Sequence, residues 1–285
     1  MATIYNKATL SFGGNVVNSN TTEAELISRF DITKTAVTAS YSAGGNVVYA
    51  VTISNMSSTA YSGLTLTDDL GAYTLPGGSV VVPLTYVDGS IMYYLNGVLQ
   101  PDPTVVAAGN LTISGINVPA NSTALFIYEV TANEYAPLAA GSSITNTVFS
   151  DVGSCVGEIS TSATITVEEE PELTIAKAVC PTVVNDSCQL TYTIIVQNLG
   201  NTPIVATDGV IISDTFNPIL SDIAVTLNGA PLDEGTGYSY DALTGAFATL
   251  DGVVTVPAAT YTQDPVSGVI TTTPGVAVLT ITGTI

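Results

Sequence analysis

The stretch FDITKTAVTASYSAGGNVVYAVTISN, residues 30–55, returns later in the chain as ELTIAKAVCPTVVNDSCQLTYTIIVQN, residues 172–198. In both copies apolar and polar residues alternate, which is typical of β-strands that turn one face toward a core. The interval from lysine to tyrosine is the same in the two copies, Lys34 to Tyr49 and Lys177 to Tyr192. The stretch therefore indicates two copies of one β-rich domain.

Two further motifs follow in the same order in each copy. LTLTDDL contains Asp68 and VIISDTF contains Asp214, and both stretches continue the alternation. A Leu-Asn-Gly triplet comes next in both copies, ending at Gly97 and at Gly229. Asn-Gly pairs favour the tight turns of β-hairpins. Short strands joined by polar turns, repeated at a long period, predict an all-β chain with two tandem Ig-like β-sandwich domains.

The two copies differ at their C-terminal ends. After STALFIYEVTA the first copy continues with SSITNTVFSD and GEISTSATITV, whereas the matching strand of the second copy, GVAVLTITGTI, has no such sequel. We therefore expect domain 1, residues 30–168, to be a complete sandwich. We expect domain 2, residues 169–285, to lack two strands, which would leave a sheet edge unpaired and apolar side chains uncovered.

Residues 1–29 contain a pair of strands that matches the pair missing from domain 2. TIYNKATLSF aligns with SITNTVFSDV when Asn6 is set against Asn146, and SNTTEAEL aligns with STSATITV. We expect residues 1–29 to be donor strands that complete domain 2 of a neighbouring copy by strand addition. A head-to-tail contact of this kind generates filaments. The alternative is that these strands fold back onto domain 2 of their own chain.

The composition narrows the functions and partners open to the chain. Its 285 residues include 4 Lys and Arg against 24 Asp and Glu, a formal net charge of −20 at pH 7. Such a surface repels nucleic acids and anionic membranes, so neither is an expected partner. The chain contains no His, which excludes Ser-His-Asp and Cys-His catalysis and His-ligated metals. We expect no enzyme with turnover, no cofactor and no metal site.

Three polar residues of domain 1 fall on the apolar faces of their predicted strands. Lys34 shares a face with Ile32, Asn146 shares one with Ile144, and Asp68 alternates with the leucines of LTLTDDL. Desolvation favours the neutral forms of lysine and aspartate. A neutral lysine amine can attack an Asn side-chain carbonyl while a nearby acid moves a proton to the leaving ammonia. The set predicts a Lys34–Asn146 isopeptide cross-link, with Asp68 as the assisting acid.

In domain 2 the same triad requires two chains. Lys177 and Asp214 hold the positions of the lysine and the aspartate, and the matching amide is Asn6 at the other end of the sequence. The alignment therefore predicts an intermolecular Lys177–Asn6 cross-link assisted by Asp214.

Three alternatives remain open for these residues. The lysine and the aspartate of each domain could form a buried ion pair beside a hydrogen-bonded Asn. A strand register displaced by one residue would place all three residues in solvent. Glu129, in LFIYEVTA, could be the acid of domain 1 in place of Asp68, although domain 2 has no acid near that point.

Cysteine occurs at positions 155, 180 and 188. Cys180 ends one predicted strand and Cys188 begins the next, so a disulfide between them would close the short intervening loop. Reduced, inert thiols are the alternative. Cys155 would then be free or would pair between chains.

The combination ITKTA, VVYAVTISN, LTLTDDL and SITNTVFSD resembles the bacterial repeat family called domain of unknown function eleven. The second copy, with LTIAKAV, LTYTIIVQNLG and VIISDTF, resembles it more closely, and the resemblance covers nearly the whole chain. It implies an Ig-like repeat of the kind found in cell-surface stalks, adhesins and clostridial endospore appendages. The lysine chemistry is similar to that of Gram-positive pilins.

Two functions are expected from these observations. The first is a structural subunit of a filament or of a spore- or cell-surface appendage, which polymerises with itself through strand donation and isopeptide cross-links. The alternative is a surface adhesin or binding module with intramolecular isopeptide bonds and no polymerisation. The N-terminus shows no basic segment followed by an apolar run, as a signal peptide would. We therefore expect an extracellular or spore-surface protein assembled in the mother-cell cytoplasm.

Overall fold

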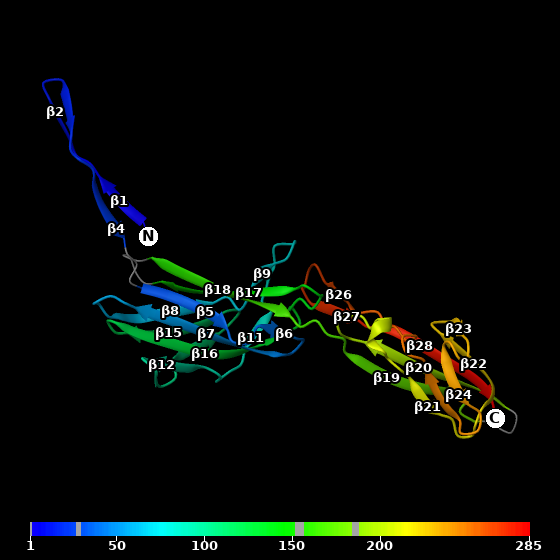
Figure 1. Ribbon diagram of the computed structural model, residues 1–285. Coiled ribbons are helices and arrows are strands. Elements are labelled where there is room, and N and C mark those ends of the chain that lie inside the picture. The colour runs from blue at the N-terminus through cyan, green and yellow to red at the C-terminus, as the bar shows by residue number, and fades with distance from the viewer. Residues whose placement is uncertain (1, 27–29, 152–156, 184–187) are drawn as a thin grey trace.

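A computed structural model describes residues 2–26, 30–151, 157–183 and 188–285. These residues are almost entirely β-structure, with one short 3-10 helix, η1 (Ala206–Asp208). The all-β fold class is therefore confirmed. Within the described residues no helix is long and apolar enough to cross a membrane. Figure 1 shows an N-terminal hairpin at one end, domain 1 in the middle and domain 2 at the other end.

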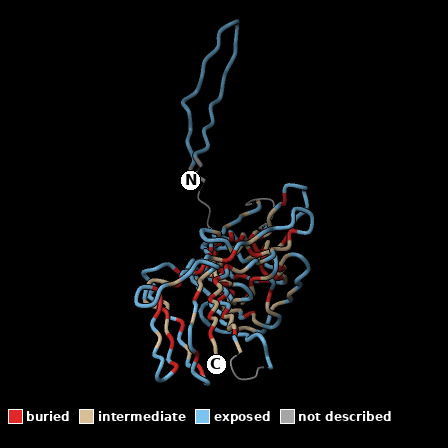
Figure 2. Tube along the Cα trace, turned by 90° about the vertical axis from the view of Figure 1, so that its right-hand side faces the viewer, coloured by how far each residue is buried: buried red, intermediate tan, exposed pale blue. Residues whose placement is uncertain are grey.

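The N-terminal hairpin projects away from domain 1 and packs against no sheet (Figure 1). Its strands are β1 (Ala2–Asn6), β2 (Thr9–Phe12), β3 (Asn15–Asn18) and β4 (Thr22–Leu26). β1 pairs with β4, and β2 pairs with β3. Figure 2 shows the hairpin exposed, and its large apolar residues Ile4, Leu10 and Phe12 are more than half exposed. A two-stranded ribbon of this kind is marginally stable in water.

The first sheet of domain 1 is formed by β5 (Phe30–Ala36), β7 (Asn46–Asn55), β11 (Leu84–Tyr86), β12 (Met92–Leu95), β13 (Val98–Leu99) and β16 (Ser122–Ala132). The strands run in the order β13–β12–β16–β7–β5, and β11 also pairs with β16. Asn96 and Gly97, between β12 and β13, have φ angles of 50° and 80°. Two positive φ angles are what a type I′ turn requires, so the Asn-Gly turn predicted there is confirmed.

The second sheet of domain 1 is formed by β6 (Ser40–Tyr41), β8 (Tyr61–Asp68), β14 (Thr104–Ala107), β15 (Leu111–Val118), β17 (Ser143–Asp151) and β18 (Glu158–Val167). Its order is β14–β15–β8–β17–β18–β6. A small hairpin, β9 (Tyr73–Thr74) with β10 (Val80–Val81), lies outside both sheets. The two sheets enclose a hydrophobic core that contains Tyr49, Phe126 and Ile165.

Domain 2 repeats the main path of the first sheet, without a counterpart of β11 among the described residues. Its members are β19 (Leu173–Cys180), β20 (Gln189–Asn198), β22 (Ser221–Leu227), β23 (Ala230–Leu232) and β28 (Gly275–Thr284). Their order, β23–β22–β28–β20–β19, is that of β13–β12–β16–β7–β5 in domain 1. Asn228 and Gly229, between β22 and β23, have φ angles of 51° and 79°, so the second predicted Asn-Gly turn is also confirmed.

The second sheet of domain 2 is shorter than its counterpart. Its strands are β21 (Ser213–Thr215), β24 (Tyr238–Asp241) and β25 (Ala246–Thr249). The order β24–β25–β21 matches β14–β15–β8 and stops where β17 and β18 follow in domain 1. Among the described residues, no strand pairs with the free edge of β21. The inner face of β19 is correspondingly exposed, whereas the inner face of β5 is buried.

Hydrogen bonds link the two domains at their junction. The hairpin of β26 (Thr260–Gln263) and β27 (Ile270–Thr273) reaches from domain 2 to domain 1. The backbone N–H of Ile270 donates to the carbonyl of Glu134 at 2.9 Å. The Asn201 side-chain amide donates to the carbonyls of Leu138 at 3.0 Å and Glu168 at 2.8 Å. These bonds hold the domains end to end, with the N-terminal hairpin and domain 2 on opposite sides of domain 1 (Figure 1).

Candidate cross-linking site

Lys34 lies at the centre of the domain 1 core. The alternation of β5 buries Phe30, Ile32 and Lys34 on one face, and the lysine side chain is 0% exposed. Its Nζ is 2.6 Å from Asp68 Oδ2 and 4.7 Å from the centroid of the Tyr49 ring. The alternative register, which would have placed the lysine in solvent, is therefore wrong.

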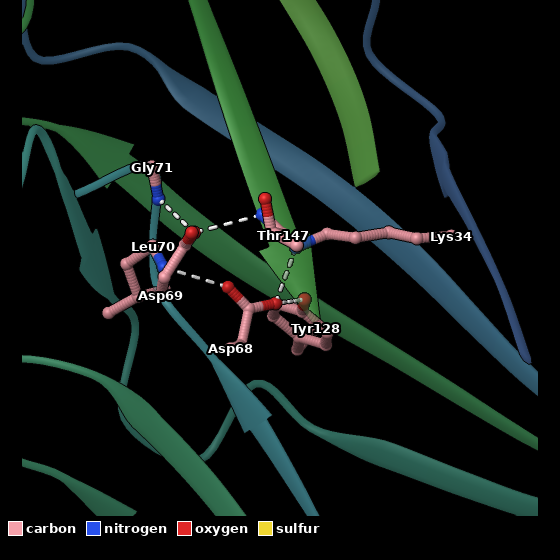
Figure 3. A network of polar contacts seen from close by, with 7 residues as sticks. All are labelled: Lys34, Asp68, Asp69, Leu70, Gly71, Tyr128 and Thr147. Carbon is pink, nitrogen blue, oxygen red and sulfur yellow. Dashed lines mark hydrogen bonds and ion pairs between the residues drawn. The ribbon is translucent and has the colours of Figure 1, made fainter. Parts of the chain in front are cut away.

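Asp68 ends β8 on the opposite sheet and faces Lys34. Its side chain is 1% exposed. Oδ1 accepts a hydrogen bond of 2.9 Å from the backbone N–H of Leu70, and Oδ2 accepts one from Lys34 and one from the hydroxyl of Tyr128 (Figure 3). Both oxygens of this carboxylate are thus held by the protein.

Asp69, the next residue, turns its carboxylate toward β17 instead (Figure 3). Its Oδ1 accepts hydrogen bonds from the backbone N–H groups of Gly71 at 2.8 Å and Thr147 at 2.9 Å. Thr147 is adjacent to Asn146 in the chain. Asp69 therefore helps to fix the position of Asn146 along β17 relative to Asp68.

Asn146 lies on the inner face of β17 and is 0% exposed. Val148 pairs with Asp68 across the sheet, so Asn146 is the diagonal neighbour of Asp68 on the same face. Neither its Oδ1 nor its Nδ2 has a hydrogen-bond partner among the described residues. Buried polar side chains are nearly always hydrogen-bonded. By hydrogen-bond geometry Asn146 therefore differs from the hydrogen-bonded Asn of the ion-pair alternative, although the Tyr49 hydroxyl is close enough for the amide to affect its pKa.

Burial shifts the pKa values of three groups around this amide. Desolvation lowers the pKa of Lys34, although the charges of Asp68 and Asp69 act in the opposite direction. Burial raises the pKa of Tyr49, and the adjacent Asn146 amide partly opposes that shift. Burial also raises the pKa of Tyr128. An unprotonated lysine amine is a nucleophile, and burial favours that form, so this core places a lysine, a carboxyl group and a buried amide in one dry site.

Glu129 is not the acid of this site. It lies on β16 between Tyr128 and Val130, both of which are buried in the core. Because side chains alternate along a strand, Glu129 projects from the outer face of the sheet. Asp68 is the acid that contacts Lys34.

Domain 2 presents the lysine and the aspartate in an open setting. Lys177 on β19 contacts Asp214 on β21, and their side chains are 40% and 16% exposed. The Lys177 Nζ lies 4.6 Å from the centroid of the Tyr192 ring and 5.4 Å from that of Phe216. The Lys177 amine therefore packs against aromatic rings, as the Lys34 amine packs against Tyr49, but it remains accessible to solvent.

Asn6, the third predicted member of the domain 2 triad, lies elsewhere. It is the last residue of β1 and is exposed on the N-terminal hairpin. The hairpin and domain 2 lie at opposite ends of the chain (Figure 1). A single chain thus brings together two of the three residues, and its hairpin does not fold back onto its own domain 2. The Lys177–Asn6 cross-link stays a prediction about two chains.

The predicted disulfide is not formed in this structure. Cys180 is exposed and has a free thiol, so it is not bonded to Cys188. Cys155 lies outside the described residues.

The tyrosines of the site were not predicted from the sequence. Tyr49 and Tyr192 recur at the same interval after the two lysines, and that interval was a signal that they belong to the site. The ring under each amine is the structural reason for the repeat. Tyr128 has no counterpart in the second copy, so the repeat carried no signal for it.

No model of a known protein family and no curated protein matches the sequence, so the resemblance to domain of unknown function eleven is not confirmed.

The solved structures similar to this chain include Gram-positive pilins. The major pilin subunit BcpA of Bacillus cereus is 10% identical, with 94% of this chain and 70% of that chain covered and a TM-score of 0.39. The pilus backbone RrgB of Streptococcus pneumoniae is 10% identical, with 87% of this chain covered and a TM-score of 0.36. This chain spans about half of RrgB, since 55% of that chain is covered. Domains D2 and D3 of the pilin SpaD of Corynebacterium diphtheriae are 10% identical, with 85% of this chain and 88% of that chain covered and a TM-score of 0.35.

Proposed function

We propose that this chain is a structural subunit of a filament on a cell or spore surface. Each subunit donates its N-terminal hairpin to domain 2 of the next subunit. Lys177 then forms an isopeptide bond with Asn6 of the donated hairpin, assisted by Asp214, and Lys34 forms the equivalent bond with Asn146 inside domain 1.

The pairing of the hairpin supports its role as a stand-in for β17 and β18. Asn6 pairs with Thr22 in the hairpin, and Asn146 pairs with Ala163 in domain 1. The alignment of the two strand pairs sets Thr22 against Ala163 independently of the asparagines. Strand order, register and the position of the asparagine are therefore shared by the hairpin and the pair of strands that closes domain 1.

The free edge of β21 offers the matching place in domain 2. In domain 1, β17 joins β8 through the pair Val148–Asp68. The same register in domain 2 sets Ala8 of the donor against Asp214. Asn6 then lies diagonally across from Asp214 on the inner face, as Asn146 does from Asp68. This position is next to the amine of Lys177, which contacts Asp214.

The apolar surfaces of the two partners also match. The hairpin exposes Ile4 at 55% and Leu10 at 63%, and β19 exposes Leu173 at 40% and Ile175 at 64%. Burying a side chain of this size contributes about 1.5–3 kcal/mol each. Donor and acceptor lie at opposite ends of the chain (Figure 1), so each added subunit presents a new acceptor and the assembly continues.

The covalent step balances without any added reagent. The proton of the lysine ammonium moves to the aspartate, and the free amine attacks Cγ of the asparagine. The Nζ–Cγ bond forms, the Cγ–Nδ2 bond breaks, and the departing nitrogen leaves as ammonia with protons relayed through the aspartate. The products are a neutral amide and ammonia, and the one remaining proton stays on the aspartate or leaves with the ammonia as ammonium, so the positive charge of the lysine disappears from the core. An enzyme with turnover does not result, because each site reacts once.

The single observation that carries the proposal is the uncovered inner face of β19 beside a free edge of β21. Its test is a denaturing, reducing gel of the purified full chain with intact-mass and peptide mass spectrometry. We expect a ladder of covalent oligomers and a Lys177–Asn6 peptide lighter by one ammonia, about 17 Da. The variant Asn6→Ala should lose the covalent ladder but still associate, whereas a chain without residues 2–26 should stay monomeric.

A monomer of unmodified mass would contradict the proposal. A monomer with only the Lys34–Asn146 bond would instead match the surface adhesin with intramolecular cross-links. The two outcomes are separated by the peptide that carries the loss of ammonia.

A further inference from the structure

Tyr128 is the one tyrosine whose hydroxyl contacts the acid of the domain 1 site, among the residues that the structure describes. It lies on the inner face of β16 and is 1% exposed. Its hydroxyl donates to Asp68 Oδ2, the same oxygen that faces the Lys34 amine (Figure 3). The ring lies 6.0 Å from the Tyr49 ring, measured between centroids. The hydroxyl therefore has a fixed approach to the carboxylate.

Domain 2 has no tyrosine at the equivalent point. Tyr128 pairs with Tyr49 between β16 and β7. In the matching pair of strands, β28 and β20, the residue opposite Tyr192 is Ile281. Asp214 Oδ1 accepts a hydrogen bond of 2.9 Å from the backbone N–H of Thr215, its own neighbour. Among the described residues, Asp214 has no hydroxyl donor in the role of Tyr128.

We propose that Tyr128 is a positioning residue for isopeptide formation in domain 1. This inference rests on the proposed function, because it concerns the Lys34–Asn146 reaction. The Leu70 N–H holds Oδ1 and the Tyr128 hydroxyl holds one side of Oδ2. Hydrogen bonds to both oxygens hold the carboxylate in one orientation, in which Oδ2 also accepts a hydrogen bond from the Lys34 amine.

Tyr128 exchanges no proton in this scheme. The proton travels from Lys34 Nζ to Asp68 Oδ2 and then to the departing Nδ2 of Asn146, while the tyrosine remains a donor to Oδ2. A donor to a carboxylate favours the ionised form. Tyr128 therefore favours the carboxylate form with which the reaction starts, and it holds Oδ2 in place to receive the lysine proton. Domain 2 must react without this support.

The other titratable groups around Asp68 come from three directions. Lys34 faces it from β5, Tyr49 faces the lysine and Asn146 from β7, and Asp69 follows it in the chain. Each of these groups is unchanged in the variant Tyr128→Phe. A change in the pH dependence of the reaction in that variant therefore reports the lost hydroxyl.

The test follows ammonia loss in the full chain carrying Asn6→Ala, so that only domain 1 can react. The protein is purified in denaturant, so that it is still unreacted, and is then refolded at pH values from 5 to 9. Its intact mass is recorded over time. Tyr128→Phe is compared with Tyr41→Phe. Tyr41 is equally buried, and its hydroxyl donates to the carbonyl of Pro137 at 2.5 Å, away from the site. Circular dichroism verifies that both variants refold.

We expect Tyr128→Phe to slow the loss of ammonia about tenfold, since one hydrogen bond to a charged group is worth roughly one factor of ten. We also expect the acid limb of its pH profile to move to higher pH, because the carboxylate loses a hydrogen-bond donor. Tyr41→Phe should match the parent in rate and profile. If Tyr128→Phe refolds and reacts like the parent, the inference is wrong and the proposed function stands. If the parent chain itself loses no ammonia, both are wrong.

Discussion

Strands β5 and β19 have nearly the same sequence pattern and opposite surroundings. Ile32 of β5 is 6% exposed, and Ile175, its counterpart in β19, is 64% exposed. The lysine that follows has a side chain 0% exposed in one strand and 40% exposed in the other. Each strand pairs with a single neighbour, β7 or β20, in an equivalent register. The strands themselves therefore do not account for the difference.

The difference is made by the sheet that faces them. In domain 1, β17 and β18 complete the opposite sheet, and β18 lies over β5. In domain 2 the opposite sheet ends at β21 within the described residues. A strand pattern with one apolar face requires a cover, and in domain 2 this requirement is unmet. The comparison supports the proposal that β19 and β21 form an acceptor surface.

The comparison also bears on when each lysine can react. Lys34 is enclosed as soon as domain 1 folds, and burial lowers its pKa. The side chain of Lys177 stays exposed to solvent until another surface covers β19. We therefore expect the domain 1 bond to form during folding and the bond between chains to form only after docking.

The largest contrast is expected from a charge placed on the inner face of each strand. Ile32→Asp should destabilise domain 1 by more than about 4 kcal/mol, because it buries an unpaired carboxylate in the core. Ile175→Asp should change the stability of the monomer by less than about 1 kcal/mol, because that side chain is exposed. It should nevertheless abolish the oligomer ladder.

Urea unfolding and denaturing gels measure the two effects in this pair of variants. Equal destabilisation by both substitutions would show that β19 is covered within one chain. The comparison of the two strands would then fail.

Removal of the lysines gives the next contrast. In the variant Asn146→Ala, which cannot form the internal bond, Lys34→Ala leaves Asp68 buried without its cation and should cost about 3–5 kcal/mol. Lys177→Ala breaks a partly exposed pair and should cost less than about 1 kcal/mol in the monomer. Thermal unfolding of the monomers measures both. Lys177→Arg is the matched control, since it keeps the charge but lacks the nucleophilic amine, and it should permit docking without a covalent bond.

A peptide of residues 2–26 should fill the acceptor surface when it is added to a chain that lacks those residues. At a hundredfold excess over its Kd it should stabilise domain 2 by about 2.7 kcal/mol, because binding to the folded state adds this amount by mass action. Hydrogen exchange should slow at β21 and β19. A peptide with Ile4→Asp is the control and should bind weakly, and equal protection by both peptides would argue against the proposed register.

The smallest expected effect is a pH dependence of domain 1 in the variant Asn146→Ala, which cannot form the internal bond. Because burial lowers the pKa of Lys34 from 10.5, the unfolded chain binds more protons than the folded chain below that pH. Stability should therefore rise with pH toward 10, by on the order of 1 kcal/mol per pH unit at most. Above pH 10 the tyrosines oppose this, since burial raises the pKa of Tyr41 to about 12 and the unfolded state then binds fewer protons.

Denaturant unfolding between pH 7 and 10 checks this prediction. The double variant Lys34→Met with Asn146→Ala should show no such rise. A rise of the same size in the double variant would assign the effect to other groups.

The all-β class, the two hairpin turns and the inward faces of the strands could be read from the sequence. Alternation states which residues share a face, and this pattern alone places Lys34, Asp68 and Asn146 on apolar faces. The Asn-Gly pairs determine the turns locally, because the backbone of these residues accepts positive φ. The repeat added the counterpart of each residue in the second copy.

The sequence could not show which residues meet across the sandwich. The contact between Tyr128 and Asp68 joins β16 of one sheet to β8 of the other, and no spacing rule connects them. The turn of Asp69 toward Thr147 depends on how β17 lies against β8.

The sequence by itself determined the strands, their faces and the repeated set of lysine, aspartate and asparagine, because these follow from local alternation and from comparison of the two copies. Only the tertiary structure decided that Lys34 is buried beside an amide without a hydrogen-bond partner by geometry, whereas Lys177 lies partly exposed next to a free sheet edge. The physical reason is that a strand is buried only when another sheet packs over its apolar face, and the sequence of the strand itself does not supply that sheet. The cover is formed by residues far away in the chain, and in domain 2 we propose that it comes from another chain.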